Sequence, residues 1–127
     1  MIEIEFEDEL CRIWIEKGIV YAVYKTKTID INIAKNMLHQ RFNICNGKVY
    51  PLLADITQLN SINKEARDYL GDEGVKLLNA NAILIKSSVN RIIGNFYLNI
   101  TKPKIPTKLF TNKEEALIWL QQFKEPK

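Results

Sequence analysis

Five polar residues in the second half of the chain have the types and spacing to bind an anionic group: Arg91, Asn95, Lys102, Lys104 and Lys108. Arg91 and Asn95 are four residues apart, so a helix presents both on one face. If the proline-containing segment 102–106 folds back beside that helix, the cations meet near a helix N-terminus. Charge and free backbone donors there suit a phosphate or a carboxylate. The alternative is that Arg91 and Asn95 hold the helix to this segment through internal hydrogen bonds.

A second group of polar residues follows the apolar run 49–54. Asp55 ends this run, and function in α/β folds usually lies at the carboxyl end of a central strand. Asp55 is therefore either a polar ligand contact or a cap that accepts backbone donors of the following turn. Ser61 and Lys64 lie at the turn into the next helix, where Ser61 can act as a helix N-cap.

Enzymatic chemistry finds little support in the remaining residues. His39 is the only imidazole, and without a paired carboxylate or hydroxyl it is expected on the surface of a helix. No cluster of His, Cys and Asp has metal-ligand spacing, and Gly71 and Gly74 follow no strand, so they form no phosphate-binding loop. We therefore expect no catalytic residue, no metal and no cofactor, and we interpret the chain as a non-enzyme.

Length and composition indicate a single domain over residues 1–127. There is no apolar run long enough for a membrane span, and the acidic, alternating start does not match a signal peptide. We thus expect a cytoplasmic protein, with Cys11 and Cys45 as reduced thiols.

The net charge of +3 is too small to predict nucleic-acid binding. Residues 74–113 contain seven bases and no acid, which is either one patch for an anionic partner or an ordinary solvated face.

The elements that must position these residues follow from hydrophobic periodicity. Alternation predicts strands over 2–7, 10–16 and 19–24, forming an antiparallel hairpin or three-stranded meander closed by Lys17-Gly18. Trp14, Tyr21 and Tyr24 on this hairpin either form an exposed patch that pairs two copies or pack in the core. Helical spacing follows from Asp30 to Gly47, with Asp30 or Thr28 as N-cap.

The rest of the chain alternates strands with helices. Because proline donates no hydrogen bond, we expect the paired strand to start at about Leu52, after Pro51. A helix is predicted over 62–78 with a break at its glycines, then a strand over 80–86 and a helix from Ser87 or Ser88 to Ile100. A short strand over 107–110 and a helix opened by a Thr111–Glu114 capping box complete the chain. The predicted fold is a mixed α/β sheet, with an N-terminal antiparallel hairpin and parallel strands crossed over by helices.

From Lys48 onward the order of motifs is distinctive. It runs through Leu53-Ala-Asp-Ile, Lys64-Glu-Ala-Arg-Asp-Tyr, Asn90-Arg-Ile-Ile-Gly-Asn-Phe and Lys102-Pro, and ends in Phe110-Thr-x-x-x-Glu-Ala-x-x-Trp-Leu, its most specific part. This order resembles the SpoIIAA-like group of bacterial proteins, which has the STAS (anti-sigma-factor antagonist) and Sec14-type fold. In phosphorylation-switched STAS proteins the strand-to-helix turn carries Asp-Ser-Ser-Gly. Here Asn63 stands in the place of the acid and Lys64 in that of the phosphorylated serine, which departs from the switch motif, and Ser61 is the nearest hydroxyl, in a shifted register.

The resemblance implies a non-enzymatic regulatory module that acts by binding an unknown partner, and we expect it to be a homodimer. The alternative is a Sec14-like binder of a small apolar or anionic ligand such as a lipid. That function would require a cavity, expected under the helices 88–100 and 111–123. A deep apolar pocket in the structure would favour the ligand binder. A closed core with an apolar two-fold interface would favour the partner-binding module.

Overall fold

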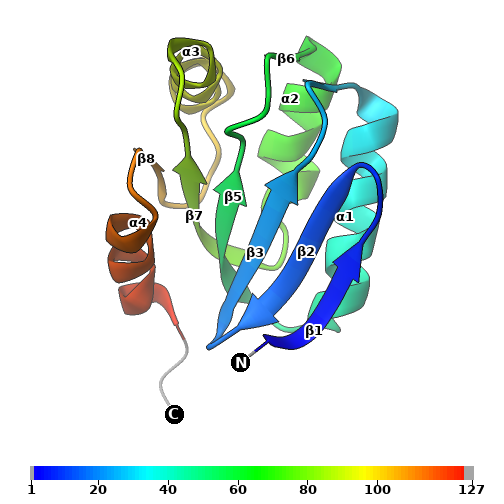
Figure 1. The fold of residues 1–127 in the computed structure, drawn as a ribbon, viewed down its shortest axis with the longest axis vertical. Coiled ribbons are helices and arrows are strands. Elements are labelled where there is room, and N and C mark those ends of the chain that lie inside the picture. Colours follow the sequence, from blue (N-terminus) through cyan, green and yellow to red (C-terminus); the bar gives the residue numbers. More distant parts are fainter. Residues whose placement is uncertain (1, 125–127) are drawn as a thin grey trace.

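Six strands form one mixed sheet with helices on both faces in the computed structural model, which describes residues 2–124 (Figure 1). The strand order is β1-β2-β3-β5-β7-β8. β1 (Ile2–Glu7), β2 (Cys11–Glu16) and β3 (Ile19–Tyr24) form the predicted antiparallel meander. The turn between β2 and β3 holds Lys17 and Gly18 at φ of 51° and 78°, a conformation that favours glycine. The predicted fold class is confirmed.

Parallel strands complete the sheet from β3 onward. β5 (Tyr50–Asp55) pairs with β3 and with β7 (Leu78–Leu84), and β7 pairs with β8 (Thr107–Phe110). Pairing with β3 starts at Leu52, as expected from Pro51, but β5 itself begins at Tyr50, two residues earlier than predicted. The β5–β7 register shifts between Tyr50 and Pro51, which accommodates the missing donor.

A small second sheet was not predicted. β4 (Thr28–Ile29) and β6 (Ser61–Ile62) pair in parallel, so residues 61–62 belong to a strand and not to the following helix. Two-residue strands carry no periodicity of their own, which is why the sequence pattern does not reveal them. They join the two chain segments that leave the carboxyl ends of β3 and β5.

Four capped helices cover the sheet in the described part of the chain: α1 (Ile31–Cys45), α2 (Lys64–Asp72), α3 (Ser88–Phe96) and α4 (Lys113–Leu120). Their N-caps are Asp30, Asn63, Ser87 and Asn112, each accepting a hydrogen bond from a first-turn backbone N–H. The predicted break after α2 is confirmed as a 3-10 turn over Glu73–Val75. The predicted Thr111–Glu114 capping box is wrong, because Asn112 supplies the cap one residue later.

The two faces of the sheet carry separate apolar clusters. α4 packs on one face, where Ala116 and Leu120 meet Ala80, Ala82 and the β2–β3 aromatics. α1, α2 and α3 cover the other face, and Figure 1 shows α1 beside α2 there. Trp14, Tyr21 and Tyr24 are all buried, with Trp14 and Tyr21 stacked at 4.7 Å between ring centroids. The core alternative for these three residues is therefore correct, and the exposed dimer patch is not formed.

No helix within residues 2–124 is both long enough and apolar enough to cross a membrane.

Candidate functional site

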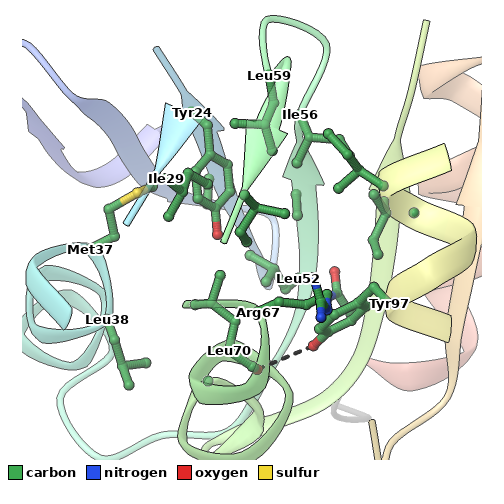
Figure 2. A pocket seen from close by; sticks show the side chains of 18 of the residues that line it. Tyr24, Ile29, Met37, Leu38, Leu52, Ile56, Leu59, Arg67, Leu70 and Tyr97 are labelled. Carbon is green, nitrogen blue, oxygen red and sulfur yellow. Dashed lines mark hydrogen bonds between the residues drawn. The ribbon is translucent and has the colours of Figure 1, made fainter. Parts of the chain in front are cut away.

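A partly open cavity of about 90 Å³ lies between the sheet and the helices α1, α2 and α3 (Figure 2). Its wall is mostly aliphatic, and the labelled apolar side chains are Ile29, Met37, Leu38, Leu52, Ile56, Leu59 and Leu70. The sequence analysis predicts a Sec14-like cavity under 88–100 and 111–123. Half of that prediction is wrong, because α4 lies on the opposite face of the sheet. α1 and α2 take its place.

Small residues on adjacent strands leave the space. Ala22 of β3 pairs in register with Ala54 of β5, and both line the cavity floor. Across the cavity, Gly94 lets α3 approach β8 so closely that a Cβ at this position would lie 2.7 Å from Leu109 Cδ2. The cavity thus results from alanines in the floor while the surrounding helices are held tightly against the sheet.

Arg41 brings a positive charge into the wall of this cavity. It is only 4% exposed, and its guanidinium donates to the carbonyl oxygens of Gly74 at 2.7 Å and Lys76 at 3.2 Å. Burial lowers the pKa of Arg41 from its ordinary value. An arginine side chain nevertheless keeps its proton in a protein, so the cavity wall carries a cation.

Two further polar side chains in the wall have atoms without a hydrogen-bond partner among residues 2–124. Arg67 of α2 lies with Cζ 4.1 Å from the Phe96 ring centroid, and its buried Nε has no acceptor. Asn81 of β7 is 7% exposed, and its buried Oδ1 has no donor. Both residues line the cavity. Buried polar atoms are almost always paired, so two orphans at one cavity indicate a site that can accept a polar ligand.

Two tyrosines complete the polar part of the wall. Tyr97 donates a 3.1 Å hydrogen bond to the carbonyl of Leu70, drawn as the dashed line in Figure 2. Burial raises the pKa of Tyr24 to about 12, and burial also raises the pKa of Tyr97. Both phenols are therefore neutral hydrogen-bonding groups at ordinary pH. Among the described lining residues there are two arginines and no aspartate or glutamate. The cavity thus has a mostly aliphatic wall that includes two cationic side chains.

The sequence-predicted cationic group lies elsewhere and only partly together. Arg91, Asn95, Lys102, Lys104 and Lys108 are all exposed. Arg91 and Lys108 line one open groove beside the edge strand β8, together with Glu115 and Trp119 of α4. Asn95, Lys102 and Lys104 are not among the described residues that line this groove.

Asp55, Ser61 and Lys64, the second group of polar residues predicted from the sequence, have local structural contacts. Asp55 Oδ1 accepts from Thr57 N at 2.9 Å and from Thr57 Oγ1 at 2.7 Å, the turn-closing arrangement given above as the alternative. Ser61 lies in β6, and the expected helix-cap role falls to Asn63, whose Oδ1 accepts from Ala66 N at 2.9 Å. Lys64 is exposed and pairs with Asp68 at 2.6 Å across one helical turn.

Sequence reasoning missed the three polar residues of the cavity, although two carried a signal. Asn81 interrupts an otherwise apolar strand, and Arg41 falls on the same face of α1 as Ala34, Leu38 and Cys45. A polar residue on a predicted core face is the kind of exception that marks a site. Arg67 gave no such signal, because its cavity contact depends on how α2 packs. His39 is exposed, as expected.

The apolar side of α3 is only partly buried. The sequence places six apolar residues on one side of α3 and its continuation to Ile100: Val89, Ile92, Ile93, Phe96, Tyr97 and Ile100. Ile93 and Tyr97 do pack inward, but the remaining four are exposed: Val89, Ile92, Phe96 and Ile100. Their spacing of three, four and four residues places them on a second stripe of the same helix.

One solved structure shares this fold, and the comparisons with known proteins leave the function open. A crystal structure of an uncharacterised DUF3478-family protein from Shewanella loihica PV-4, described as having a SpoIIAA-like fold, is similar at a TM-score of 0.59 and 17% identity. The match covers 94% of this chain and 92% of that one. A protein of unknown function from Arthrobacter sp. FB24 is 26% identical over 82% of this chain and 92% of its own, at a TM-score of 0.31.

A search of curated proteins finds no match. The family model "Domain of unknown function (DUF7793)" matches residues 13–124, which is most of the chain. The chain therefore belongs to the DUF7793 family, and its fold is SpoIIAA-like.

Proposed function

We propose that this protein is a non-enzymatic binding module that holds a small, largely apolar molecule in the cavity between the sheet and α1, α2 and α3. The observation that carries the proposal is the cavity itself, which is lined by aliphatic side chains and yet bordered by arginines and an unpaired amide. Concave, mostly apolar sites with a few polar groups are the usual form of small-molecule sites. Asp55 and Lys64 have local side-chain partners, and Ser61 is paired through its backbone in β6, which favours structural roles for these three residues.

The size of the cavity limits the ligand. Its volume is about 90 Å³. Ligand pockets for drug-sized molecules are larger, roughly 300–1,000 Å³. We therefore propose a short-chain compound in place of a lipid with long acyl chains.

Hexan-1-ol, a short-chain compound, tests the proposal by calorimetric titration of the wild type and of Ala54→Leu. The leucine side chain would fill the cavity floor, so we expect saturable binding to the wild type and a loss of about tenfold or more in affinity for the variant. Ala80→Leu is the matched control. Ala80 is fully buried on the α4 face, away from the cavity. There the added leucine overpacks the core and should lower the free energy of unfolding by about 1–3 kcal/mol, whereas Ala54→Leu should lower it by less. Equal affinity of wild type and Ala54→Leu would contradict the proposal.

A second candidate is a regulatory module that pairs with another copy of itself through α3. The exposed stripe Val89, Ile92, Phe96 and Ile100 favours it, because four large apolar residues in one row exceed the scattered exposure of an ordinary surface. A helix stripe is also self-complementary about a two-fold axis, which suits a homodimer. The groove with Arg91 and Lys108 would remain beside this contact as a place for an anionic group.

A further inference from the structure

We infer that the cavity ligand is a short-chain 2-hydroxy carboxylate, with its carboxylate at Arg67, its hydroxyl at Asn81 and its aliphatic tail against the sheet. This inference rests on the proposed function, because it names the chemical class that the proposed cavity binds. It is carried by three independent features of the wall: its charge, its orphaned polar atoms and its size.

The charge of the wall selects an anion. Arg41 and Arg67 both border the cavity, and none of its described lining residues is acidic. Among residues 2–124 no carboxylate pairs with Arg41, whose hydrogen bonds go to the backbone carbonyls of Gly74 and Lys76. A buried charge without a counter-ion is costly, so a ligand that brings one negative charge recovers part of that cost. A carboxylate is favoured over a phosphate dianion. The second negative charge of the dianion would lose its water in the mostly aliphatic cavity and find no partner there, which is unfavourable.

The orphaned atoms select the rest of the polar group. Arg67 Nε–H requires an acceptor, and Asn81 Oδ1 requires a donor. A carboxylate oxygen supplies the acceptor, and a charge-assisted hydrogen bond of this kind is among the stronger ones. A carboxylate alone leaves Asn81 Oδ1 without a donor. A hydroxyl on the neighbouring carbon supplies it, so a 2-hydroxy acid satisfies both atoms with one compact group.

The apolar part of the wall selects the tail. Ala22 and Ala54 form the floor, and Ile13, Leu52 and Ile83 lie around it. An aliphatic tail of about four carbons beyond the hydroxy acid would pack against this floor. 2-Hydroxyhexanoate is therefore the probe of choice.

The first test is calorimetric titration of the full chain with 2-hydroxyhexanoate, hexanoate and hexan-1-ol, which share one tail. We expect the hydroxy acid to bind most tightly and the alcohol most weakly, with about tenfold or more between these two. Equal affinity for the hydroxy acid and the alcohol would overturn the inference while leaving the cavity's binding function intact. If none of the three probes binds, the proposed function fails as well.

The second test uses two arginine variants that lose the same charge. Arg67→Met should weaken 2-hydroxyhexanoate by about tenfold or more and leave hexan-1-ol unchanged. Arg91→Met, on the exposed side of α3, should leave both unchanged. Asn81→Leu should abolish the preference for the hydroxy acid over hexanoate. An equal effect of Arg67→Met and Arg91→Met would count against a specific contact and indicate only a general loss of positive charge. The probe series on the wild type decides the question even if a variant fails to fold.

Discussion

Asn90 and Arg91 are neighbours in the chain with opposite roles. Asn90 is 1% exposed, and its Oδ1 accepts from the backbone N–H groups of Lys86 and Ser87, both at 3.0 Å. Its Nδ2 donates to the carbonyl of Leu59 at 2.7 Å. Asn90 thereby ties the start of α3 to the loop that follows β5. Arg91 is exposed and faces the open groove.

We predict that Asn90→Ala lowers the free energy of unfolding by about 2–4 kcal/mol, because it leaves a buried carbonyl and two backbone donors without their partner. Arg91→Ala should change it by less than about 0.5 kcal/mol, as for exposed positions in general. Urea denaturation measures both. A large fall for Arg91→Ala would instead support its alternative role in holding the helix through internal hydrogen bonds.

The buried phenol of Tyr24 leads to a prediction about protein stability at alkaline pH. Burial raises its pKa to about 12, above the ordinary value of 10.0. The neutral phenol is therefore favoured in the folded state. Its stabilising contribution is complete below about pH 10 and is lost as the pH rises from about 10 to about 12, where the unfolded chain ionises first.

The free energy of unfolding of the wild type should thus fall more steeply between pH 10 and pH 12 than that of Tyr24→Phe, which keeps the ring and removes the hydroxyl. Urea titrations at several pH values compare the two proteins. Tyr97 and Cys11, whose pKa values burial also raises, remain in both and provide the common background. Parallel curves for the two proteins would show that Tyr24 does not contribute to the pH dependence.

At the scale of elements, α3 has two faces with different partners. Its inner face holds Ile93 and Gly94 over the cavity, and its outer face carries the exposed apolar stripe. If this stripe pairs two copies, Ile92 is near its centre and is 67% exposed in the single chain.

We predict that the wild type sediments as a dimer and that Ile92→Asp is a monomer, because a carboxylate cannot be buried in an apolar contact without a partner. Ile118→Asp is the matched control, since Ile118 is 72% exposed on α4 and lies outside the stripe. It should remain a dimer in analytical ultracentrifugation. A monomeric wild type, or a dimeric Ile92→Asp, would rule out this interface.

Most elements could be predicted from the sequence, because their signals are local. Alternation located the meander, and Asp30 and Ser87 were foreseen as caps since Asp and Ser accept first-turn donors. The predictions were wrong where contacts between distant segments decide the secondary structure or the exposure of a residue. Residues 61–62 form a strand only because β4 lies beside them, and Ile92 is exposed only because Ile93 faces the sheet.

At the scale of the whole molecule, the cavity depends on residues from strands β2 to β7 and from helices α1, α2 and α3. No local sequence pattern connects these elements. Ala22 and Ala54 lie 32 positions apart and meet only through the β3–β5 register. The candidate site predicted from sequence consisted of exposed cations, because charge is visible in a sequence and a cavity is not. Asn81 and Arg41 were the available signals, as polar residues on faces that periodicity assigns to the core.

The most direct test of the central claim is a ¹H–¹⁵N NMR titration of the full chain with 2-hydroxyhexanoate. The side-chain resonances of Asn81 Nδ2 and Arg67 Nε should shift together and saturate, while that of Arg91 Nε stays in place. Saturable shifts confined to Arg91 and the exposed lysines, with Asn81 and Arg67 unmoved, would contradict binding inside the cavity.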